Sequence, residues 1–543
     1  MRLTLTPGGG ISSPPTTTID QLPPELLGII FTFVHEDVVV NAQGFNLSLA
    51  LSEADQSDDD ADDEDDDSQQ SIDMTRWMFS HNNMVDSSRT PSFFPYGLAA
   101  VCDTWKNVLS ATPTFWTRLV LFVDYASPTP VEDARKYLSW SRQLPISVMI
   151  TRRYRLGIDR FVNDVQSARV NTFISLLHPH MARCRSFHLD VEANSSVPAL
   201  SRIVPNNARL LKLLSLSCRL DTFANSEGFT PHDDDASSPG AQKIRLKVMS
   251  IDGRTFHCAC IDMPTWFEYQ PQLEYLAISQ YNTDDHRLPL ATTLRTIEEQ
   301  FSSKLSTLSF MSLNFEIDTI DLEDSSYGFW NIRDLYLDDI QPELVAELFR
   351  VSFFPRLHVL QLQRCSALDK KIFNDIDSDV RTLCFSNPPS EFADSDMCDF
   401  LSSWRGLAIC FTLWKRPHDE LLVALAEERD PDPETDWQTG IEGGKYFMCP
   451  NLHFLIFVSC PIPSFTSLKK LIESRNHYVN YDDPEWRNNT HWGPAISKLS
   501  IKYCLTTSDS VSSKEEWDWI SQRVDLTFVD GPLNLSNLLE DTK

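Results

Sequence analysis

The chain has 543 residues, 42% of them hydrophobic, which is enough for a small docking motif and one large domain. Its net charge of −30 disfavours binding to nucleic acids and to anionic membranes, so we expect neither as a partner. A membrane-spanning helix is not expected either, because the sequence has no run of about eighteen apolar residues. Residues 1–18 contain one arginine and no apolar stretch, which predicts a disordered N-terminus rather than a signal peptide.

The first predicted element is a helix that starts with Leu22-Pro23-Pro24-Glu25 and continues to Val34. Proline suits the first helical turn, where the missing N–H would have no partner in any case. Apolar residues at every fourth position, with two more beside them, predict one broad apolar stripe: Leu22, Leu26, Ile30 and Val34, with Leu27 and Phe31.

A polar and strongly acidic insertion follows, at about 36–93. From Glu53 to Asp67, eleven of fifteen residues are Asp or Glu. Such a run repels itself and has nothing to bury, so we expect it to be disordered and extended. Two interpretations remain open. The insertion could be a solvated spacer, because the entropy cost of closing a loop grows slowly with its length, or it could attract a basic partner electrostatically.

Helical spacing resumes at Leu98 and continues into a short helix that begins at Thr112-Pro113. Three short helices cannot bury all of this apolar surface among themselves, so a helix of a partner protein would be a natural cover. The alternative is that they pack onto the chain's own domain. The apolar residues of these two helices include Val101, Trp105, Phe115 and Trp116.

Joined across the insertion, Leu-Pro-Pro-Glu-Leu-Leu, Ala-Ala-Val-Cys-x-x-Trp and Pro-x-Phe-Trp resemble the F-box, over residues 19–120. The resemblance implies docking on a Skp-family adaptor of a cullin ubiquitin ligase. Family members usually join the first two helices by a short turn, and the insertion departs from this pattern. The residues that the resemblance assigns to adaptor binding are Leu22, Pro23, Leu26, Leu27, Ile30, Phe31, Val101, Trp105 and Trp116.

Beyond a connecting segment, 121–183, the spacing apolar-x-x-apolar-x-apolar occurs eleven times in 184–543. Six of the ten intervals between middle positions fall within the 20–29 residues of leucine-rich repeats. We therefore predict an α/β fold in which an irregular leucine-rich-repeat solenoid, with parallel strands and helical or loop returns, follows the F-box. An unrelated α/β domain with buried parallel strands is the alternative. The middle positions are Phe187, Leu214, Met249, Leu276, Leu308, Leu335, Leu360, Leu383, Leu407, Leu455 and Leu499.

Helical returns are predicted from composition at 343–349 and 419–428, and a capping box at Ser512 or Ser513 predicts a helix that seals the array. The twelve cysteines form no paired framework, and most fall at repeat positions. Free buried thiols indicate a reducing compartment, the cytoplasm or the nucleus.

The sequence predicts neither a cofactor nor a metal site. His257-Cys258-Ala259-Cys260 is the only tight cluster of ligand-type residues, and no second pair lies nearby. No Gly-x-Ser-x-Gly elbow, His-Glu-x-x-His pair or phosphate-binding loop is present, so we predict no catalytic residues.

These features predict a non-catalytic adaptor that docks through the F-box and presents an unknown protein substrate, held by the repeats, for ubiquitination. The acidic composition would suit a basic substrate. The alternative is an acidic scaffold or chaperone-like protein that binds basic partners without a ubiquitin ligase.

Overall fold

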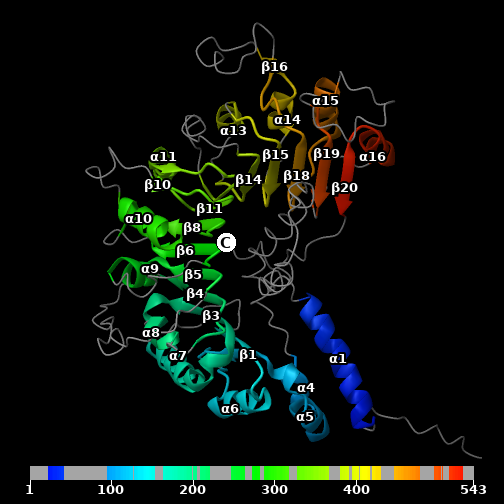
Figure 1. Cartoon of the computed structure of the whole chain (residues 1–543). Coiled ribbons are helices and arrows are strands. Elements are labelled where there is room, and N and C mark those ends of the chain that lie inside the picture. Colours follow the sequence, from blue (N-terminus) through cyan, green and yellow to red (C-terminus); the bar gives the residue numbers. More distant parts are fainter. Residues whose placement is uncertain are drawn as a thin grey trace, which may run out of the picture. The chain divides into compact units, whose positions relative to one another are not determined.

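The structure is a computed structural model of the chain, shown in Figure 1. The predictions for 1–18 and for the acidic run Glu53–Asp67 lie outside the residues that it describes. The described residues are 22–41, 94–125, 127–152, 163–198, 200–204, 208–220, 246–262, 272–281, 287–316, 327–365, 380–389, 394–402, 404–415, 419–429, 446–476, 495–502, 504 and 513–529.

The chain divides into two compact units, Met1–Val191 with Arg202–Leu213 and Glu192–Ser201 with Leu214–Lys543. Its main sheet has fourteen strands in the described residues, in the order β1-β2-β3-β4-β5-β6-β8-β11-β13-β14-β15-β18-β19-β20. The predicted α/β class is confirmed, and the strand pairs of this sheet described below are parallel. This arrangement is compatible with a solenoid, because strands that follow each other in sequence are also neighbours in the sheet.

The first unit combines helices with the first strands of the sheet. The segment 121–183, predicted only as a connection, forms strand–helix alternations of its own, with β1 paired to β2 and β2 to β3. The elements are α1 (Pro24–Asn41), α4 (Tyr96–Ala99), α5 (Asp103–Ser110), η3 (Pro113–Trp116), β1 (Arg118–Phe122), α6 (Val131–Trp140), β2 (Ile146–Thr151), α7 (Asn163–Leu177), η4 (His178–Arg183) and β3 (Cys184–Ala193).

The second unit alternates sheet strands with helical or loop returns. Its elements begin with η5 (Asn194–Ser196), α8 (Leu200–Ile203), β4 (Leu213–Leu220), β5 (Val248–Asp252), α9 (Gly253–Phe256), the π-helix η6 (His257–Asp262), β6 (Tyr275–Tyr281), β7 (Leu288–Pro289), α10 (Leu290–Phe301), β8 (Thr307–Leu313), β9 (Phe315–Glu316), β10 (Tyr327–Gly328), β11 (Asp334–Asp338) and α11 (Pro342–Val351). They continue with β12 (Ser352–Phe353), β13 (Val359–Gln363), β14 (Thr382–Ser386), α13 (Asp394–Leu401), β15 (Ala408–Thr412), α14 (Asp419–Leu425), β16 (Glu428–Arg429), β17 (Tyr446–Phe447), β18 (Phe454–Val458), α15 (Phe465–Arg475), β19 (Lys498–Lys502), α16 (Lys514–Ser521) and β20 (Asp525–Val529).

Two rows of apolar side chains, called ladders below, run across the sheet of this unit from strand to strand. Helices α10, α11 and α14 lie on one side of its strands (Figure 1). Leu335 and Leu337 of β11 pair with Leu308 and Phe310 of β8, and all four are buried. Parallel strands in register place equivalent side chains next to each other, so the ladders form a continuous core. One ladder comprises Met249, Leu276, Leu308, Leu335, Leu360, Leu383, Ile409, Leu455, Leu499 and Leu526.

One predicted repeat was wrong by two residues. The sequence pattern put Trp404, Leu407 and Ile409 in the three apolar positions, but Ile409, not Leu407, pairs with Leu383 of β14. The first position of this repeat is therefore Gly406. The indole ring of Trp404 fills the space beside it, and its Nε1 donates to the carbonyl oxygen of Val380 at 3.0 Å. A large ring from two residues upstream thus replaces the usual aliphatic side chain.

A left-handed residue occurs at one repeated position, which lies near the end of a strand or just after it. Asp339 after β11 and Arg364 after β13 have φ of 55° and 51°. Their N–H groups donate to the carbonyl oxygens of Gln363 and Ser386 on the next strands, which extends the ladder by one bond. These residues are not glycine, so the left-handed conformation costs about 1–2 kcal/mol at each. The other residues at this position are Gln280, Ser312, Asn387, Leu413 and Ser459.

The predicted returns and the C-terminal helix are present. Helix α11 contains 343–349, and α14 covers the first seven residues of 419–428. The capping box belongs to Ser513, which accepts from the N–H of Glu516 and donates its own N–H to the Glu516 carboxylate. Helix α16 does not end the array, however, because β20 follows it and pairs with β19.

Candidate partner-binding surfaces

Helix α1 divides its apolar residues between two faces. Leu27 and Phe31 point into the first unit and are buried, and the Phe31 ring meets the Trp105 ring edge-on at 5.2 Å. Leu22 is partly buried against the same cluster. These residues anchor the helix, because they lie one turn apart on the side that faces α5.

The other face of α1 is apolar and exposed. Leu26 and Ile30, two of the predicted adaptor-binding residues, are 46% and 37% exposed, and Pro23 is exposed as well. Phe33 is the most exposed of this set, at 67%. A soluble protein rarely leaves several neighbouring apolar side chains on one helix uncovered, and such a surface is typical of a docking site. We call Leu26, Ile29, Ile30, Phe33 and Val34 the outer face of α1.

The predicted site residues of the second half divide in the same way. Val101 precedes α5 and is 55% exposed, whereas Trp105 and Trp116 are buried in the cluster with Leu27 and Phe31. The indole Nε1 of Trp116 donates to the Leu109 carbonyl oxygen at 2.9 Å, which fixes η3 against the end of α5. The nine predicted residues therefore fall into three groups. The chain's own helices cover Leu27, Phe31, Trp105 and Trp116, Leu22 is partly buried, and Pro23, Leu26, Ile30 and Val101 face outward.

Tyr96 joins this helical cluster to the sheet, a role that the sequence reasoning missed. Its hydroxyl donates to the Arg118 carbonyl oxygen at 3.0 Å and accepts from the Val120 N–H at 2.9 Å, so it replaces a missing strand partner at the edge of β1. Burial raises the pKa of Tyr96, which keeps the hydroxyl protonated and able to donate. The tyrosine lies two residues before the helical spacing that starts at Leu98, but no spacing rule distinguishes it. Ile29 and Phe33 were missed as well, although Ile29 lies three positions after Leu26 and Phe33 three positions after Ile30.

A second candidate surface lies on the strands of the second unit. Residues that alternate with the apolar ladders point to the opposite face of each strand. In β11 these are Asp334, Tyr336 and Asp338, and the residues paired with them on the flanking strands are mostly polar. We call the following set the polar strand face: Thr307, Ser309, Asp334, Tyr336, Asp338, Gln361, Gln363, Cys384 and Ser386.

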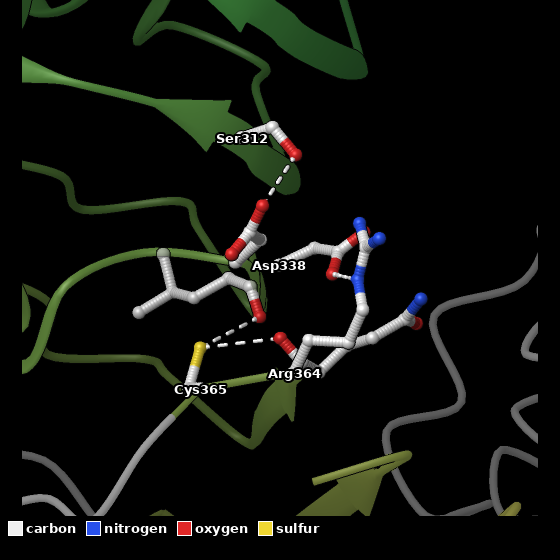
Figure 2. A network of polar contacts seen from close by, with 7 residues as sticks. Ser312, Asp338, Arg364 and Cys365 are labelled. Atoms are coloured by element: carbon white, nitrogen blue, oxygen red, sulfur yellow. Dashed lines mark hydrogen bonds and ion pairs between the residues drawn. The ribbon is translucent and has the colours of Figure 1, made fainter. Parts of the chain in front are cut away.

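Asp338 pairs with the guanidinium group of Arg364 (Figure 2). Arg364 donates from Nε and Nη2 to the two carboxylate oxygens, each at 2.8 Å, in a bidentate pair. Burial raises the pKa of Asp338, and the hydrogen bonds from Arg364 oppose that rise. Figure 2 also shows Ser312, which donates to Asp339, and Cys365, whose thiol lies 3.3 Å from the Gln363 carbonyl oxygen.

Asp334 lies four residues earlier on the same face and has no such partner. Its only hydrogen bond from a side chain in the described residues comes from the hydroxyl of Thr307, at 3.3 Å. Burial raises the pKa of Asp334 to about 6, opposed by that hydrogen bond and then by the charge of Arg333. Among the described residues, a bonded arginine therefore distinguishes the two carboxyl groups of β11: Asp338 has one and Asp334 has none.

The described residues contain no group of three or more His, Cys, Asp or Glu side chains placed to hold a metal ion. His257 and Cys260 lie in η6, and Cys260 is buried, with its pKa raised by burial. All twelve cysteines are free. Within the described part of the chain, no helix is long and apolar enough to span a membrane.

No family model matches the chain, and no curated protein matches it. No residue role can therefore be carried over from a relative. The outer face of α1 and the polar strand face are the two surfaces from which function can be argued.

Proposed function

We propose that the protein is a substrate-recognition adaptor that performs no bond chemistry itself. The outer face of α1, with Pro23 and Val101, would dock on a Skp-family protein and through it on a cullin. The second unit would hold a protein substrate for ubiquitination. This extends the resemblance of 19–120 to the F-box.

The observation that carries the proposal is the division of α1 into a buried and an exposed apolar face. Leu27 and Phe31 already anchor the helix, so fold stability does not require Leu26, Ile30 and Phe33 to be apolar. Exposed apolar side chains at helical spacing suit a partner that supplies its own apolar groove or helix. The insertion at about 36–93 leaves this arrangement possible, because α1, α5 and η3 share one buried cluster on either side of it.

The test measures binding of the purified full chain to a purified Skp-family adaptor by calorimetry. We expect the double variant Leu26→Ala, Ile30→Ala to weaken binding by at least about tenfold, because two apolar anchors are lost from the contact. Leu210→Ala is the matched control, since Leu210 lies in the same unit and is exposed to a similar extent, 43%. The docking face would be wrong if both variants bound as the wild type does.

The acidic composition favours a second candidate, a scaffold that binds basic proteins without a ligase. It predicts that proteins co-purified from cells are basic and that no Skp-family protein is among them. Loss of capture at raised ionic strength would support it, because exposed charge pairs are screened by salt.

A further inference from the structure

The polar strand face contains buried polar atoms that the described part of the chain leaves without hydrogen bonds. They are Gln361 Oε1 on β13 and Ser386 Oγ on β14. More than nine in ten buried polar groups in native proteins have a partner. Two exceptions on one face of the neighbouring strands β13 and β14 therefore indicate a surface whose hydrogen bonds are completed by another molecule.

Asp334 lies on β11, the strand next to that of Gln361. It pairs in register with Val359 of β13, and Gln361 pairs with Tyr336 two residues farther along β11. Adjacent strands are ~4.8 Å apart and each residue rises ~3.3 Å, so Asp334 and Gln361 are diagonal neighbours on one face, about 8 Å apart at their Cα atoms. The pKa of Tyr336 is raised mainly by burial and next by the charge of Asp334. The phenol therefore lies close to the carboxyl group.

We propose that this part of the strand face binds a cationic side chain, lysine or arginine, of a protein substrate. Asp334 supplies the carboxylate, Gln361 Oε1 supplies a second acceptor, and the ring of Tyr336 supplies a face for the cation. Asp338 cannot take this role, because Arg364 already occupies both of its oxygens. The inference rests on the proposed function, since it names the kind of substrate segment that the second unit would hold.

The experiment uses the full chain and three peptides of alternating serine with lysine, acetyl-lysine or arginine. We expect the lysine or the arginine peptide to bind at least about tenfold more tightly than the acetyl-lysine peptide, because acetylation removes the charge. Asp334→Asn should remove most of that difference. Asp525→Asn is the matched control, because Asp525 occupies the equivalent position on β20 and its substitution removes the same charge.

Gln361→Met separates binding from folding. The buried Gln361 oxygen has no partner in the described residues, so its loss should leave the thermal midpoint unchanged or raised while the cationic peptides bind more weakly. Binding to the wild type should also strengthen from about pH 5 to about pH 7, as Asp334 loses its proton, and Asp334→Asn should abolish this dependence. The other titratable or charged groups around Asp334 are Tyr275, Arg333, Tyr336 and Cys384. His358 donates its N–H to the Arg333 carbonyl oxygen, and His358→Gln serves as the control for a histidine contribution.

Equal binding of all three peptides, or undiminished binding by Asp334→Asn, would overturn the inference. The same variants are tested with the Skp-family adaptor. If the chain binds the adaptor but does not prefer cationic peptides, this inference is wrong and the proposed docking function stands. If it prefers cationic peptides but does not bind the adaptor, the docking function is wrong and this inference stands.

Discussion

Helix α1 and strand β13 carry the same kinds of side chain in opposite environments. Leu26 and Ile30 of α1 are exposed, whereas Leu360 and Leu362 of β13 are buried between neighbouring strands and the returns. Each strand is covered by the repeats on either side, so the ladder needs no partner protein to bury its apolar side chains. The outer face of α1 has no neighbour of that kind among the described residues. The comparison teaches that apolar content alone does not separate a core from a docking surface.

The largest effect should come from Leu360→Ala. Leu360 is fully buried and pairs with Leu335 and Leu383, so truncation leaves a cavity in the ladder. We expect the free energy of unfolding of its cooperative unit to fall by about 2–5 kcal/mol, measured by urea denaturation. A loss below about 1 kcal/mol would mean that the ladder is not a close-packed core.

Asp334→Asn should stabilise the protein near neutral pH. The folded-state pKa is about 6 and lies above the unfolded value of ~3.9. Well below pH ~4 the carboxyl group is protonated in both states and does not affect the free energy of unfolding. Between about pH 4 and 6 the unfolded state gives up its proton first, and stability is lost as pH rises. We expect the variant to be more stable than the wild type by about 3 kcal/mol at pH 7 and by only about 0.5 kcal/mol at pH 4, by denaturation at both values. A variant that is less stable at pH 7 would show that the carboxylate has a stabilising partner.

Gly406→Ala tests the repeat in which a tryptophan replaces an aliphatic residue. A Cβ at this position would collide with the Trp404 ring and with the Val380 carbonyl oxygen. We expect a loss of about 1–3 kcal/mol, because the ring must leave its place and its hydrogen bond to Val380. Trp404→Leu in the same background should restore part of the loss, since a smaller side chain leaves room for the methyl group.

The smallest effect on folding should come from Leu26→Ala. Leu26 lies on the outer face of α1, and alanine has a slightly higher helix propensity. We expect the thermal midpoint of the isolated protein to change by no more than the equivalent of about 0.5 kcal/mol. A loss as large as that of Leu360→Ala would show that the outer face is part of the core, and the comparison between α1 and β13 would fail.

The sequence by itself determined the class of the fold and most of the repeat register. Apolar-x-x-apolar-x-apolar fixes which strand residues face the core, because side chains alternate along a strand and a parallel sheet stacks equivalent positions. The pattern failed at Trp404, where a ring reaches across two residues into the space above Gly406. It also missed β1, β2 and β20, which lie outside the predicted repeats 184–501.

Only the tertiary structure decided which apolar residues of α1 are available to a partner. The fourfold spacing of Leu22, Leu26 and Ile30 marks a helix face but does not say which side the other helices cover. The aromatic rings of Phe31 and Trp105 settle it, because their contact turns Leu27 inward and leaves Leu26 and Ile30 exposed. In the same way, sequence alternation places Asp334 and Asp338 on one face, but only the fold gives Asp338 its arginine, from a residue 26 positions away, and leaves Asp334 with a hydroxyl.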